Sequence, residues 1–140
     1  MSRMSLDEEI SAIEATVNGL ENEMESGKFS VKTIVDELQS HINSTSDFAT
    51  QMAKGQETMD RILDKISKLD IGYLTALKYN HSHEPHVCEV LNRAANCIMK
   101  FMDIGFAANE LFGDPDVRAQ IKSQNQELRK GLKEMLSSLL

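Results

Sequence analysis

One stretch decides the fold: residues 31–66 read VKTIVDELQSHINSTSDFATQMAKGQETMDRILDKI. Its apolar residues recur at spacings that alternate between four and three, the heptad repeat of a coiled coil or of a long bundle helix. The positions of this first seam are Val31, Val35, Leu38, Ile42, Thr45, Ala49, Met52, Gln56, Met59, Leu63 and Ile66. The spacing predicts one helix over residues 31–68, with a kink allowed at the polar run 43–47 or at Gly55.

Further apolar residues flank the first seam at Ile34, Phe48 and Ile62. They widen the apolar stripe beyond that of a two-stranded coiled coil. We therefore expect this helix to contact more than one neighbour.

A second heptad precedes the first seam. Its positions are Leu6, Ile10, Ile13, Val17, Leu20 and Met24, which predict a helix over residues 5–26. Gly27 fits a helix C-terminus and Ser30 fits the N-cap of the next helix. Because the register also shifts here, a turn is favoured over one continuous helix with a stutter.

The second half of the chain carries its own helix signals. A short helix is expected over residues 71–79, and Pro85 suits the first turn of the next one. That helix has apolar or small residues at Val87, Leu91, Ala94, Ile98, Phe101, Gly105, Ala108 and Phe112. Its small residues would let another backbone approach closely. Gly113, Asp114 and Pro115 then predict a corner between two helices.

The last predicted helix covers residues 115–139. Its seam is Ile121, Asn125, Leu128, Leu132, Met135 and Leu139. The fold class expected is all-α: a long heptad-bearing helix with an N-terminal acidic helix and a C-terminal helical hairpin, forming a coiled coil or an elongated helical bundle. Residues 1–80 would form the coiled-coil or helical-hairpin region and residues 81–140 the C-terminal hairpin.

Asn125 occupies an a position of the last seam. A lone Asn at such a position can specify a parallel two-stranded pairing in register, because two amides satisfy each other across the seam. An Asn at an exposed edge, or one that is hydrogen-bonded inside a mixed bundle, would look the same in the sequence. Both interpretations stay open at this point.

Charge is unevenly distributed along the chain. The net charge is −7, and residues 1–27 hold one Arg against seven acidic residues, which leaves −1 for the rest. Residues 117–140 are basic, with a net charge of +3. The acidic first helix is therefore predicted to pair with the basic last one, within a chain or between chains. An acidic chain also argues against direct contact with nucleic-acid phosphates.

Cys88 and Cys97 lie nine residues apart on one predicted helix, so they point in opposite directions and cannot bridge. The N-terminus shows no secretion signal, and charges interrupt every apolar run before it reaches membrane-spanning length. The expected location is intracellular, cytoplasmic or nuclear, without membrane contact.

Residues 81–88 hold three His, Glu84 and Cys88, which resembles a metal-binding composition. His86 and Cys88 would point about 200° apart on a helix that begins at Pro85, so no metal and no cofactor is expected. The sequence contains no glycine-rich phosphate loop and no nucleophile elbow. An enzyme is therefore not expected.

The function expected is that of a helical scaffold or adaptor that assembles with itself or with other helical subunits. The predicted interface residues are Val31, Val35, Leu38, Ile42, Met52, Met59, Leu63 and Ile66 of the first seam and Asn125, Leu128, Leu132, Met135 and Leu139 of the last. One alternative is a compact bundle that holds a ligand or metal near the loop His81–Cys88. Another is a viral or phage accessory protein that binds a host or polymerase subunit.

Overall fold

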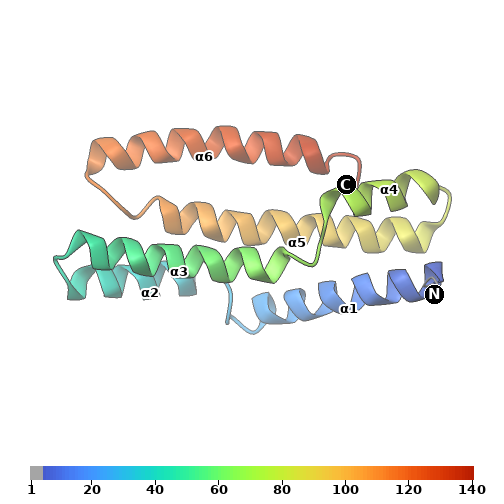
Figure 1. Ribbon diagram of the computed structural model, residues 1–140, viewed down its shortest axis with the longest axis horizontal. Coiled ribbons are helices and arrows are strands. Elements are labelled where there is room, and N and C mark those ends of the chain that lie inside the picture. Colours follow the sequence, from blue (N-terminus) through green and yellow to red (C-terminus); the bar gives the residue numbers. More distant parts are fainter. Residues whose placement is uncertain (1–4) are drawn as a thin grey trace.

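The computed structural model describes residues 5–140, and the regular structure in this range is entirely α-helical. The helices are α1 (Leu6–Glu25), α2 (Val31–Ser44), α3 (Phe48–Ile66), α4 (Ile71–Asn80), α5 (Pro85–Asn109) and α6 (Pro115–Leu136). Figure 1 shows an elongated arrangement with α5 running through its middle, and each of the other helices packs against α5. The predicted all-α class is confirmed, in the form of a helical bundle.

Helix α5 is central because it is apolar around most of its circumference. Its buried residues are Val87, Val90, Leu91, Ala94, Ala95, Cys97, Ile98, Met99, Phe101, Ile104, Gly105 and Ala108. Close packing depends on the small ones. A Cβ added at Gly105 would lie 3.1 Å from the sulfur of Met59, so glycine lets α3 come near. The backbone that approaches this stripe of small residues belongs to the same chain.

Helix α1 follows the predicted heptad closely. The Ser5 side chain caps it by accepting a hydrogen bond from the Glu8 amide. Its buried residues are Ile10, Ile13, Val17 and Leu20. Gly27 then adopts a φ of +80°, and Ser30 caps α2 by accepting from the Thr33 amide. The predicted turn between the first two helices is confirmed.

The single helix predicted over residues 31–68 is wrong, because the chain breaks between α2 and α3 at residues 45–47. Asp47 starts α3 by accepting a hydrogen bond from the Ala49 amide. The Gln51 side chain donates to the carbonyl oxygens of Ile42 and Thr45, at the end of α2. These local polar hydrogen bonds replace the backbone hydrogen bonds of a continuous helix. As a result, α2 and α3 form an antiparallel hairpin, with α2 behind α3 in Figure 1.

The break changes which residues of α3 face the core. Thr58 and Ile62 are the buried residues of α3, and Ile62 had been expected only as a flank of the seam. Met59 and Ile66 remain half-buried, whereas Met52 and Leu63 are exposed. Ala49 and Gln56 are exposed as well, so four of the six predicted seam positions on α3 face away from the core.

The remaining helix boundaries follow local signals. Asp70 caps α4, and Pro85 lies in the first turn of α5. At the next corner Gly113 has a φ of +93°, and Asp114 caps α6 by accepting from the Val117 amide. The corner predicted from these residues is confirmed. The proposed division at residue 80 stays a prediction, although α5 packs on helices from both sides of it.

Candidate interaction surface

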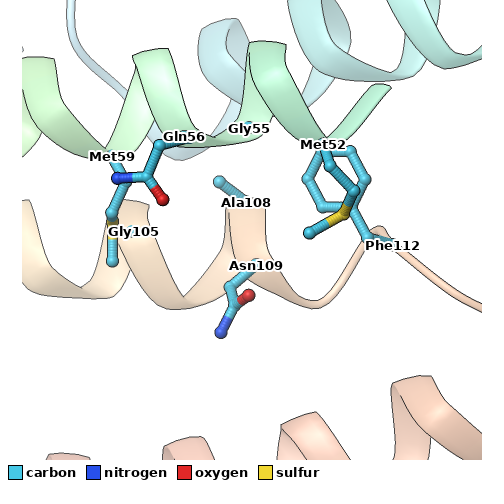
Figure 2. A pocket seen from close by; sticks show the side chains of 8 residues that line it. All are labelled: Met52, Gly55, Gln56, Met59, Gly105, Ala108, Asn109 and Phe112. Atoms are coloured by element: carbon cyan, nitrogen blue, oxygen red, sulfur yellow. The ribbon is translucent and has the colours of Figure 1, made fainter. Parts of the chain in front are cut away.

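Three helices form a layer, and one side of it is not covered by any other helix in the described residues 5–140. Helices α3 and α6 lie on opposite sides of α5 and run parallel to each other (Figure 1). A shallow groove of about 140 Å³ lies between α3 and α5. It is lined by Met52, Gly55, Gln56, Met59, Gly105, Ala108, Asn109 and Phe112. Figure 2 shows the groove and its lining side chains from close by.

The α3 side of this layer carries exposed apolar residues. Met52 is 44% exposed and Leu63 is 45% exposed, and both lie on the flank of α3 that includes Gln56. In Figure 2 the side chains of Met52 and Gln56 lie beside the groove, across from Asn109 of α5. The apolar rim of α3 is therefore continuous with the groove floor.

Two contacts fix the orientation of α6. Asn125 points onto α5, where its amide nitrogen lies 3.3 Å from the Phe106 carbonyl oxygen. Arg129 lies about 40° to one side of Asn125 on the helix, and it binds Asp103 of α5. Leu128 lies about 60° to the other side, and Met135 and Val117 follow on the same flank.

Handedness places this flank of α6 on the uncovered side of the layer. Residues of a right-handed helix turn clockwise along its direction, and α6 runs left to right above α5 in Figure 1. With Asn125 pointing down, Leu128 and Met135 turn toward the viewer, as do Met52 and Leu63 on α3. Leu128 is 61% exposed and Met135 is 60% exposed. We call this surface the open face: Met52 and Leu63 of α3, Asn109 of α5, and Val117, Leu128 and Met135 of α6.

The predicted interface residues fall into two groups. Those that pack within the chain are Val35, Leu38, Ile42, Met59, Ile66, Asn125, Leu132 and Leu139, each buried or half-buried. Those that are exposed are Val31, Met52, Leu63, Leu128 and Met135. The structure brings four of the exposed ones together on the open face. Val31 lies apart from them, at the start of α2.

Asn125 is used inside the chain. It is only 4% exposed, and its amide nitrogen also lies 3.5 Å from a carboxylate oxygen of Glu110. A parallel self-pairing of two Asn125 side chains would need that amide at an open seam, and in the single chain it is buried; pairing between copies stays a prediction. The alternative of an Asn hydrogen-bonded in a mixed bundle describes the structure.

The acidic first helix binds α5 instead of the basic last helix. Arg93 of α5 donates hydrogen bonds to Glu14, Asn18 and Glu21, all on α1. The hydrogen bond with Glu21 is the main cause that raises the pKa of Arg93. Pairing of α1 with α6 within one chain is thus corrected, because a basic residue of α5 takes that place. Pairing between chains stays a prediction.

The His-rich loop is a local structure. His81 pairs with Glu84, and His86 lies 4.0 Å from Glu14. Within residues 5–140 no three His, Cys, Asp or Glu side chains are grouped so that they could hold a metal ion. Cys88 and Cys97 are free thiols, and burial raises the pKa of Cys97 to about 11. Its thiol therefore stays protonated at neutral pH, which makes it a poor nucleophile.

No helix in the described part of the chain is long and apolar enough to cross a membrane. Comparisons with models of protein families, with curated proteins and with solved structures found no match.

Proposed function

We propose that this chain is a non-enzymatic helical scaffold or adaptor subunit that mediates protein–protein assembly, with itself or with other helical subunits. The proposal includes an intracellular setting, cytoplasmic or nuclear, where the thiols of Cys88 and Cys97 stay reduced. It assigns the assembly role to the open face.

The open face carries this proposal. Single exposed apolar residues are ordinary on protein surfaces. Here Met52, Leu63, Leu128 and Met135 occupy regular helical positions on two parallel helices, beside a groove floored by α5. Such an arrangement supports binding of another helix through its apolar face.

The groove floor adds specific shape. Gly55 and Gly105 keep the backbones of α3 and α5 close, and a Cβ at Gly55 would lie 2.9 Å from the Phe112 ring. Because Gly55 and Gly105 have no side chains, a depression is left between the two helices, into which a Leu or Met of a partner would fit. The metal-holding alternative has no such observation in its favour among the described residues.

Cross-linking of the intact chain in the cells that make it tests the proposal. A photoreactive side chain introduced at Gln56 of α3 or at Gln124 of α6, both exposed and beside the open face, should give cross-links to another protein or to a second copy. The double variant Met52→Ser/Leu128→Ser should lose them. Circular dichroism should show the same melting curve for the variant, since both side chains are exposed.

A control variant removes exposed apolar side chains elsewhere on the surface. The variant Tyr79→Ser/Leu140→Ser changes two exposed residues outside the open face and should keep every cross-link. Recovery of the same cross-linked partners from the wild type and from Met52→Ser/Leu128→Ser would contradict the proposal. So would the absence of cross-links from both photoreactive positions.

A further inference from the structure

The basic residues of α3 all turn away from the open face. Lys54 and Arg61 lie 3.4 Å and 3.7 Å from Glu37 of α2. Lys65 binds Glu23 of α1 at 2.7 Å. These partners hold the three cations on the flank of α3 opposite Met52 and Leu63. None of the Lys and Arg side chains of α3 therefore borders the open face.

The basic residues of α6 also lie on the flank that faces away from the open face. These residues are Arg118, Lys122, Arg129, Lys130 and Lys133. With Asn125 as reference, they fall between about 20° and 140° on the side of Arg129 and Asp103. Leu128 and Met135 lie about 60° and 80° to the other side. The cations of α6 are thus also turned away from the open face.

Acidic residues border the open face on both walls. Asp60 of α3 is exposed and accepts a hydrogen bond from the side chain of Gln56, which lines the groove. Glu127 of α6 is exposed beside Leu128, and both line a shallow depression with Gln124. The apolar surface therefore has a negative rim, on a chain whose net charge is −7.

We infer that the open face binds an amphipathic helix of a partner protein whose apolar stripe is bordered by Lys and Arg. This inference rests on the proposed function and specifies the partner's chemistry. A helix with acidic borders would place like charges against Asp60 and Glu127, which disfavours binding. The exposed apolar flank of α6 spans Val117 to Met135, about 27 Å, which matches a partner helix of about 18 residues.

Two synthetic peptides of about 18 residues test the charge preference directly. Both carry the same leucine stripe at heptad spacing, and the bordering positions are Lys in one peptide and Glu in the other. Fluorescence anisotropy measures their binding to the intact chain. At low salt we expect the Lys peptide to bind about tenfold more tightly than the Glu peptide. High salt should shrink this ratio, because it screens exposed charges.

Charge reversal on the rim supplies the matched variants. Asp60→Lys/Glu127→Lys should abolish or reverse the preference for the Lys peptide. Glu25→Lys/Asp36→Lys makes the same change in net charge at exposed positions of α1 and α2, and it should keep the preference. Unfolding by urea should be similar for both variants, since all four side chains are exposed.

The remaining outcomes each overturn the inference in a distinct way. Equal binding of both peptides, lost in Met52→Ser/Leu128→Ser, would overturn the charge preference and leave the proposed function standing. Binding of neither peptide would overturn helix docking on this face, and the cross-linking experiment would then decide the function separately. A stable dimer in sedimentation velocity that Met52→Ser/Leu128→Ser dissociates would assign the face to a second copy instead.

Discussion

Helices α1 and α6 have similar heptad patterns and very different burial. In α1 the seam residues Ile10, Ile13, Val17 and Leu20 are all buried. In α6 the buried residues are Asn125 and Leu136, while Leu128 and Met135 stay exposed. A heptad identifies an apolar stripe on a helix, but what covers that stripe depends on the neighbours that the fold supplies.

Polar contacts tie both helices to α5 and do not distinguish them. Helix α1 is tied to α5 by Arg93, which reaches three side chains of α1. Helix α6 is tied to α5 by the ion pair of Arg129 with Asp103, by the amide of Asn125, and by Arg118, which donates to the Glu110 carbonyl oxygen. Because the apolar seam of α1 is buried whereas Leu128 and Met135 of α6 are exposed, we infer that α1 is part of the stable core and that α6 is the more loosely held wall of the open face.

Truncating one leucine in each helix should give the largest difference in stability between α1 and α6. Leu20→Ala leaves a cavity between α1 and α5 and should lower the free energy of unfolding by about 2–5 kcal/mol. Leu128→Ala removes an exposed side chain and should change it by less than about 0.5 kcal/mol. Urea denaturation measures both. Similar losses for the two variants would show that Leu128 is buried in solution, for example against another copy.

Removing the arginine that holds each helix should give a smaller difference in stability between α1 and α6. Arg93→Ala breaks bonds to two carboxylates and one amide in a partly buried place and should cost about 1–2 kcal/mol. Arg129→Ala breaks one more exposed ion pair and should cost less than about 1 kcal/mol. Thermal unfolding at low and high salt measures both effects. An equal cost for the two would contradict the assignment of α1 to the core.

Local signals predicted the ends of helices well. Gly27, Ser30, Asp114 and Pro115 act through their own backbone and nearest neighbours, so their roles can be deduced from the sequence. The heptad spacing predicts only a kink where the structure has a complete break at residues 45–47. Thr45 and Ala49 fit the heptad spacing, which masked the capping role of Asp47 between them.

Contacts between residues far apart in the chain could not be predicted from the sequence patterns. Gly55 was noted as a weak point of a helix, but its contact with the Phe112 ring joins residues far apart in the chain. Nothing in the sequence patterns singles out Arg93, because its binding to Glu14 and Glu21 depends on which helix α1 covers. The groove and the open face depend on the same long-range arrangement.

Asn125→Leu tests whether the amide serves the fold or an assembly. The Phe106 carbonyl also accepts from the Glu110 backbone amide at 3.1 Å, so it keeps a partner when the side chain is removed. We expect the free energy of unfolding to change by less than about 1 kcal/mol and the mass in sedimentation equilibrium to stay the same. Asn125→Asp should destabilise more, since it turns a carboxylate toward Glu110. A change of mass in Asn125→Leu would support the self-pairing hypothesis.

Two exposed glycines allow a test of the difference in local stability between α1 and α6 through a small expected effect. Gly19 of α1 and Gly131 of α6 both have open space where a Cβ would lie, so alanine should stabilise either helix by about 0.5–1 kcal/mol. If α6 opens without the core, Gly131→Ala should slow hydrogen exchange about two- to fivefold in α6 alone. Gly19→Ala should slow exchange in α1 and in the slowest amides of α5, because α1 leaves only when the core unfolds. Exchange measured by mass spectrometry separates the segments, and uniform slowing by Gly131→Ala would mean that α6 unfolds together with α1 and α5.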